Sequence, residues 1–149
     1  MMSKTKSIII KLIAAVASLF ASSACILFVP VVYERHTATL ICSMGFWMFL
    51  IIGYVLIFFM KRESKKSGFK PDKKKIGLFT FFKNPTAKVI DILLLMMLTL
   101  FVVSMFLKQS EGFIQYIILF TALFLIHMHS LFNSNVYQYI QLEVRRGKE

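Results

Sequence analysis

The sequence has few acidic residues, and this shortage limits the classes of protein it can belong to. Seven Asp and Glu residues stand against eighteen Lys and Arg residues, which gives a formal net charge of +11. Such a charge is typical of nucleic-acid-binding domains when the basic residues spread over a soluble surface. Here they gather at the ends of apolar runs, as they do in membrane proteins, so we expect no nucleic-acid partner.

The sequence also lacks the residue patterns of disulfide-rich proteins and of the common enzyme classes. Its two cysteines, Cys25 and Cys42, both lie inside apolar runs and are too few for a disulfide framework. The H-E-x-x-H, phosphate-loop and G-x-S-x-G motifs are absent, and no two carboxylates have a useful spacing. These absences favour a non-enzymatic protein without a cofactor or a metal. Methionine in the apolar runs is interpreted as packing.

Long apolar runs are abundant. Apolar residues make up 58% of the chain, against about 45–50% in soluble domains. Four runs, at residues 12–32, 39–60, 86–107 and 113–133, are each long enough to cross a hydrocarbon core of about 30 Å. The sequence therefore predicts an all-α integral membrane protein, a single domain whose four transmembrane helices form two antiparallel hairpins. Residues 134–149 are predicted to be a cytoplasmic tail that continues as a helix.

The first apolar run has two possible interpretations. A basic start followed by an apolar run can be a signal peptide, and residues 22–25 faintly resemble a lipoprotein cleavage site. The run stays apolar after Cys25, however, where a signal peptide would be followed by polar sequence. We therefore interpret it as an uncleaved transmembrane helix, with a kink or an early stop at Pro30.

Residues 61–85 are predicted to form a basic cytoplasmic loop between the two hairpins. Ten of the eighteen basic residues lie within residues 60–88. Nine basic residues are predicted to form a surface for anionic lipid headgroups or a protein partner: Lys61, Arg62, Lys65, Lys66, Lys70, Lys73, Lys74, Lys75 and Lys83. Only Arg35 and Lys108 lie in the two short turns on the other side. The positive-inside rule thus predicts a plasma-membrane protein with both termini in the cytoplasm.

The second half of this loop differs from the first. Lysines flank an aromatic block at residues 78–82, which either lies in the headgroup region or simply leads into the next helix. Asn84 and Pro85 then favour a helix start, with Asn84 as the N-cap and Pro85 in the first helical position.

Small residues predict where helices approach closely, because packing rather than apolarity joins helices in lipid. Ala17 and Ala21 lie in the first run, and Gly45 and Gly53 lie in the second. They are expected to pack the two helices of the first hairpin together, since these are already tethered. A dimerisation seam is the alternative.

Four polar residues inside the apolar runs form a candidate intramembrane site: Asp91, His127, His129 and Asn133. In an antiparallel hairpin Asp91 and His129 lie at the same depth, about 6 Å below the cytoplasmic end. A carboxylate beside an imidazole could relay protons. Alternatively, Asp91 pairs with Lys88 one turn away, and the histidines form hydrogen bonds inside the hairpin. His127 and His129 point to opposite sides of one helix, which argues against a metal pair.

Two functions from different classes remain open. The leading hypothesis is a membrane protein that acts through contacts, as an accessory, regulatory or immunity-type subunit or as a small membrane effector. Its partners would be the lipid bilayer and either another membrane protein or a second copy. The alternative is a small oligomeric transporter or channel with Asp91 and His129 in a proton- or ion-linked path.

Overall fold

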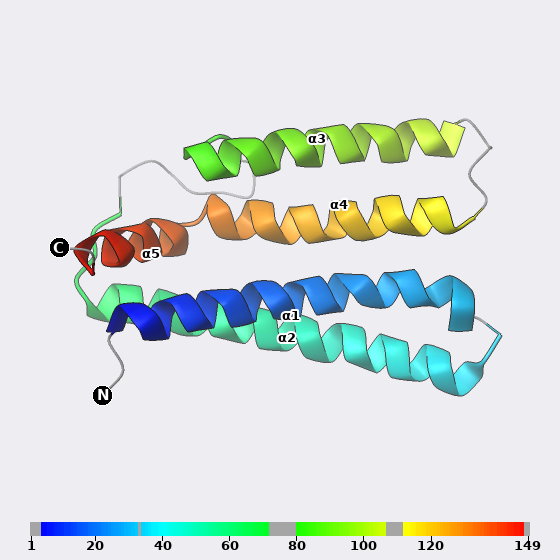
Figure 1. Ribbon diagram of the computed structural model, residues 1–149, viewed down its shortest axis with the longest axis horizontal. Helices are drawn as coiled ribbons and strands as arrows, with labels where there is room; N and C mark the ends of the chain where they lie inside the picture. Colours follow the sequence, from blue (N-terminus) through cyan, green and yellow to red (C-terminus); the bar gives the residue numbers. More distant parts are fainter. Residues whose placement is uncertain (1–3, 33, 72–79, 107–111, 148–149) are drawn as a thin grey trace.

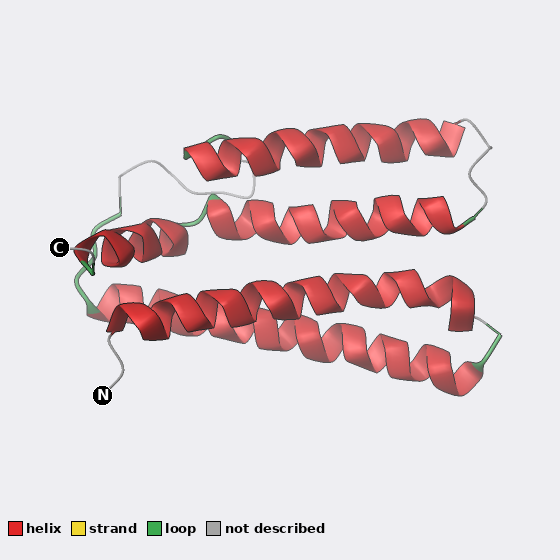
Figure 2. Ribbon diagram, in the orientation of Figure 1, coloured by secondary structure: helices red, strands yellow, loops and turns green. Residues whose placement is uncertain are grey.

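The chain folds into helices, as the computed structural model shows for residues 4–32, 34–71, 80–106 and 112–147 (Figures 1 and 2). These residues contain five helices: α1 (Lys4–Val32), α2 (His36–Lys66), α3 (Pro85–Phe106), α4 (Phe113–Phe132) and α5 (Asn135–Arg146). The first four have the length and hydropathy needed to cross a membrane. The predicted all-α class, the four apolar helices and the helical tail are confirmed, and α1 ends soon after Pro30.

The four long helices lie side by side, and both ends of the described chain lie at the same end of the bundle (Figure 1). α1 packs along α2, α3 packs along α4, and contacts between α1 and α4 join the two pairs. α5 contacts α1, α2 and α4 at the end where the chain starts and finishes. This end, here called the terminal end, therefore contains a fifth helix that the opposite end lacks within the described residues.

The first part of the predicted basic loop, which was expected to begin at residue 61, is helical in the structure. α2 continues to Lys66, so Lys61, Arg62, Lys65 and Lys66 lie on a helix and not in a loop. Basic residues in a last helical turn are stabilised by the negative end of the helix dipole. Ser67 is the C-cap of α2. Gly68 follows with a φ of 68°, a conformation that glycine adopts without steric cost. Lys73, Lys74 and Lys75 lie outside the described residues.

The interface between α1 and α2 is closest at Gly53. A Cβ atom at this position would lie 2.8 Å from both Cγ and Cδ2 of Leu19 and 3.5 Å from the Ala15 carbonyl oxygen. Gly45 is less constrained, because a Cβ atom there would lie 3.6 Å from Sγ of Cys25. Both glycines therefore lie against α1, and Gly53 is the one that permits close approach.

The small residues of α1 that meet α2 are not all those expected. Ala15 is fully buried, whereas Ala17 is exposed and lines a groove towards Phe124 of α4. Ala21 is half-buried. Ala15 and Ser22 are seven residues apart, so the helical periodicity places these two, rather than Ala17, towards α2. Ser22 is buried there and donates a hydrogen bond of 2.9 Å to the Phe46 carbonyl oxygen.

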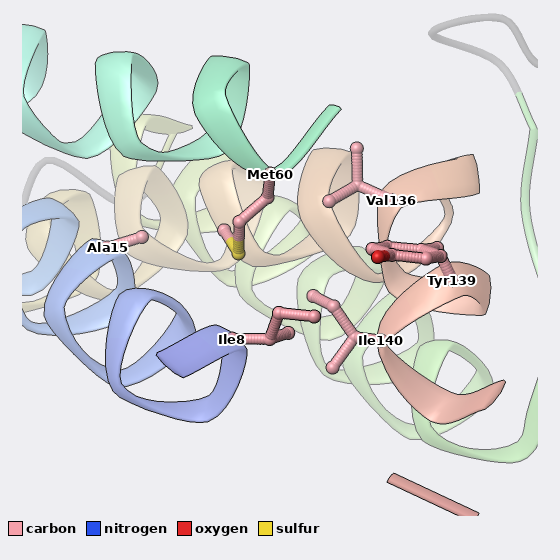
Figure 3. Close-up of a cluster of buried hydrophobic side chains, with 6 residues drawn as sticks. All are labelled: Ile8, Ala15, Met60, Val136, Tyr139 and Ile140. Atoms are coloured by element: carbon pink, nitrogen blue, oxygen red, sulfur yellow. The ribbon is translucent and has the colours of Figure 1, made fainter. Parts of the chain in front are cut away.

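The main apolar core lies at the terminal end, where α5 packs against α1 and α2. Figure 3 shows its six side chains, which point towards one another from these three helices: Ile8, Ala15, Met60, Val136, Tyr139 and Ile140. Tyr139 is the largest side chain that is fully buried. α5 places these apolar residues on one face and polar residues on the other, as a helix on the side of a core does.

Polar contacts reinforce the same end. Ser134 caps α5 by accepting a hydrogen bond from the Tyr137 backbone N–H. The buried Glu143 carboxylate forms ion pairs with Lys4 at 3.3 Å and with Arg146 at 3.7 Å. Lys11 of α1 forms an ion pair with Glu63 of α2. At the terminal end, ion pairs as well as an apolar core therefore hold α1, α2 and α5 together.

Candidate functional site

The site is built where α3 begins and α4 ends. Asn84 accepts a hydrogen bond of 2.8 Å from the Ala87 backbone N–H, so it is the predicted N-cap, with Pro85 in the first helical position. The amide nitrogen of the same side chain donates a hydrogen bond of 2.8 Å to the Phe132 carbonyl oxygen. One asparagine therefore starts α3 and also fixes its position along α4.

This position brings Asp91 to His129. The Asp91 carboxylate is fully buried, and its Oδ1 lies 2.7 Å from Nδ1 of His129. The sequence left two partners open for Asp91, His129 at the same depth and Lys88 one turn away, and the structure shows the contact with His129. A distance of 2.7 Å is typical of a charge-assisted hydrogen bond.

Two further groups donate to the same carboxylate. The Asn133 side-chain nitrogen lies 3.0 Å from Oδ1 and 3.2 Å from Oδ2. The backbone N–H of Phe82 donates to Oδ2 at 2.7 Å. We call Phe82, Asp91, His129 and Asn133 the Asp91 cluster. A buried carboxylate needs several such donors in place of water, and the cluster supplies them from the protein.

The segment before α3 folds back to reach the cluster. Phe82 has a φ of 58°, a left-handed conformation that a non-glycine residue adopts only at a cost of about 1–3 kcal/mol. Its bond to Asp91 offsets this cost. The Lys83 backbone N–H donates to Oδ1 of Asn133 at 3.3 Å, and the Phe81 ring lies over the His129 ring with centroids 4.6 Å apart. Residues 81–83 therefore cover the cluster at the terminal end.

The alternative partner of Asp91, Lys88, takes no part. Lys88 is exposed, and among the described residues the ion pair of Asp91 is with His129. The loop backbone and α4 satisfy the carboxylate from inside the fold, so a lysine reaching to the membrane surface is not needed.

His127 lies apart from the cluster. Its Nδ1 is 3.0 Å from the hydroxyl of Tyr54, so it faces α2 while His129 faces α3. The expected divergence of the two histidines is confirmed. Nε2 of His127 is buried and has no hydrogen-bond partner in the part of the chain that the structure describes. In the same part, no three His, Cys, Asp or Glu residues gather where they could hold a metal ion.

Three hydroxyl groups of α3 and α4 form hydrogen bonds within their own helices. Thr99 donates to the Leu95 carbonyl oxygen, Ser104 donates to Phe101, and Thr121 donates to Ile117. These bonds satisfy hydroxyls in an apolar setting without linking one helix to another. At the terminal end, Asp91 and Thr86 of α3 form hydrogen bonds to other helices, to His129 and Tyr137 respectively.

Sequence reasoning missed two members of the site. Tyr54 is the only tyrosine within residues 39–60, and its hydroxyl needs a partner in an apolar run, so it could have been singled out. The Phe82 backbone carries no such signal, because any residue has an N–H group. The chemistry available is a hydrogen-bonded carboxylate–imidazole pair, Asp91 and His129, beside the donors that satisfy the carboxylate.

Comparisons with protein-family models, with curated proteins and with solved structures give no match for this chain.

Proposed function

We propose that this chain is a non-enzymatic multipass membrane protein that acts through contacts. It would serve as an accessory, regulatory or immunity-type subunit, or as a small membrane effector, beside another membrane protein or a second copy. The observation that carries the proposal is the closed Asp91 cluster. Asp91 is fully buried and its oxygens accept from Phe82, His129 and Asn133, so its role is to join the segment before α3 to the bundle.

The proposal includes the arrangement in the membrane. α1 with α2 and α3 with α4 would form two antiparallel hairpins, and the terminal end would face the cytoplasm at the plasma membrane. In the sequence, sixteen of the eighteen basic residues lie in the N-terminal, central and C-terminal segments and two lie in the short turns, which supports this orientation. The basic residues would also attract anionic headgroups, at about 1 kcal/mol each near the surface.

The surfaces left for a partner are apolar helix faces. Within α3 only Ala87, Asp91 and Leu94 are buried, and all three lie in its first half. Most of the other residues of α3 are exposed, and these are open to lipid or to a neighbouring helix. Contacts in lipid depend on shape and hydrogen bonds, so such a face can serve either purpose.

Site-specific photocrosslinking in membranes tests the proposal. A photoreactive residue replaces Met96, which is 57% exposed on α3, and the control replaces Leu94, which is 4% exposed on the same helix. We expect a discrete protein adduct from position 96 and none from position 94. Lipid adducts alone, together with a monomer that purifies without a partner in mild detergent, would contradict the proposal.

The direct contact between Asp91 and His129 supports a second candidate function. In this alternative an oligomer moves protons or ions along a path that includes the pair. It predicts pH-dependent flux in liposomes that Asp91→Asn abolishes. The contact function predicts no flux from either form, so one assay separates the two.

A further inference from the structure

A groove of about 460 Å³ opens between the last turns of α2 and the junction of α4 with α5. We call it the α2–α5 groove. The inference depends on six of its lining residues: Tyr54, Ile57, Lys61, Lys65, Ser130 and Ser134. Its volume lies within the range of small-molecule sites, about 300–1,000 Å³.

One wall of the groove changes from apolar to cationic along α2. Tyr54, Ile57, Lys61 and Lys65 follow one another at intervals of three or four, so they form one stripe of the helix. The apolar run ends at residue 60, so the lysines begin where hydrocarbon would give way to headgroups. The groove thus crosses that boundary.

The opposite wall offers hydrogen-bonding groups and the start of α5. Ser130 and Ser134 line it, and Ser134 is the N-cap of this twelve-residue helix. The first N–H groups of a helix have no intrahelical partner and carry partial positive charge. Lys83 does not line the groove, but its Nζ donates to Oδ1 of Asn135, a lining residue, at 3.1 Å, so it brings a cation next to this wall.

The positive charge of the groove favours an anionic ligand, and the exposed apolar residues next to it favour a lipid. Lys61 and Lys65 both line the groove, and none of the described lining residues is acidic. Below the lysines, Tyr54 is 42% exposed and Phe58 is 61% exposed, so an acyl chain could continue along α2. A soluble phosphate would use the lysines but not the apolar half of the groove.

We propose that the α2–α5 groove binds one anionic phospholipid. Its headgroup phosphate lies between Lys61, Lys65 and the start of α5, and its acyl chain leaves past Ile57 and Tyr54. This inference rests on the membrane placement under the proposed function, and it replaces a diffuse basic surface by one stoichiometric site. The bound lipid would link α2 to α5.

Charge-matched variants test the site. Lys61→Gln with Lys65→Gln removes two charges from the groove, and Arg62→Gln with Lys66→Gln removes two charges from the same helical turns outside it. Each purified protein is mixed with phosphatidylglycerol or phosphatidylcholine in mild detergent, and bound lipid is counted by native mass spectrometry. We expect one phosphatidylglycerol on the wild type. We also expect affinity about thirtyfold lower in the first pair and nearly unchanged in the second.

A groove-filling variant, a folding control and a soluble competitor complete the test. Ser130→Trp fills the groove from an exposed position and leaves both lysines, so it should also abolish retention of the lipid. The melting temperature without added lipid shows that each variant folds. Glycerol phosphate at millimolar concentration should not displace the lipid.

Three outcomes would overturn the inference: equal losses in both charge pairs, equal binding of phosphatidylcholine, or displacement by glycerol phosphate. Its failure is distinct from failure of the proposed function. If the chain stays in membranes after alkaline extraction and still crosslinks to its partner, only the groove is refuted. Loss of the chain from the membrane pellet would refute both.

Discussion

Asp91 Oδ1 and His129 Nδ1 lie 2.7 Å apart across the interface of α3 and α4, although 38 positions separate the two residues in the chain. The contact depends on Asn84, which joins the start of α3 to the end of α4. It also depends on Phe82, whose left-handed backbone directs its N–H to the same carboxylate. The cluster therefore joins α3, α4 and the segment before α3.

Asp91→Asn is expected to destabilise the protein. An amide offers one oxygen acceptor in place of two, so at least one buried donor loses its partner at a cost of about 1–3 kcal/mol. Thermal unfolding in detergent measures the change. Leu93→Ala on the exposed side of α3 is the control and should change the melting temperature little. Equal melting temperatures for Asp91→Asn and wild type would show that the cluster does not stabilise the fold.

The same substitution should loosen the segment before α3. Without the bond to Asp91, the strained Phe82 backbone loses its main anchor. Trypsin is therefore expected to cut after Lys83 several times faster in Asp91→Asn than in wild type. Cleavage after Lys66, at the end of α2, serves as the internal reference and should not change. A uniform increase at both sites would instead indicate general unfolding.

Gly53→Ala is expected to cost about 1–3 kcal/mol, because the new methyl group would overlap the fully buried Leu19 side chain. Gly45→Ala is the matched control, since its methyl group would meet Cys25 at an ordinary contact distance. Combining Gly53→Ala with Leu19→Ala should cost less than the sum of the two single changes, as coupled neighbours do. Additive losses would contradict the contact.

Tyr139→Ala should weaken the attachment of α5. Tyr139 is 1% exposed in the core shared by α1, α2 and α5, and removing such a ring typically costs about 3–5 kcal/mol. Gln138→Ala on the neighbouring, partly exposed position is the control. Hydrogen exchange of α5 and of the first turns of α1 is the readout. Protection that survives in Tyr139→Ala would mean that α5 does not depend on this core.

The proposed orientation can be measured by cysteine labelling after Cys25 and Cys42 are replaced by alanine. Glu34→Cys should react with a membrane-impermeant maleimide in intact cells, because it lies in the short outer turn of the proposed arrangement. Lys66→Cys, at the end of α2, should react only after the membrane is opened. The reverse pattern would invert the proposed topology. Labelling of both positions in intact cells would exclude a single orientation.

Several features were predictable because they depend on nearby residues. The four apolar helices follow from run length, and the start of α3 follows from Asn84 and Pro85. The short connection between the third and fourth apolar runs made the contact of Asp91 with His129 one of two interpretations, the other being a pair with Lys88. The structure extends α2 to Lys66, beyond the predicted end of the apolar run, because lysines are good helix formers and a change to charged residues does not by itself end a helix.

The sequence by itself determined the helical class of this protein and its four apolar helices. The length of an apolar run is a local property, so it can be counted along the chain. Only the tertiary structure decided which polar groups meet. The Phe82 backbone reaches Asp91, Tyr54 reaches His127, and α5 closes the α2–α5 groove. Each depends on helix rotation and on a chain reversal, which are fixed by packing among distant residues and leave no local pattern in the sequence.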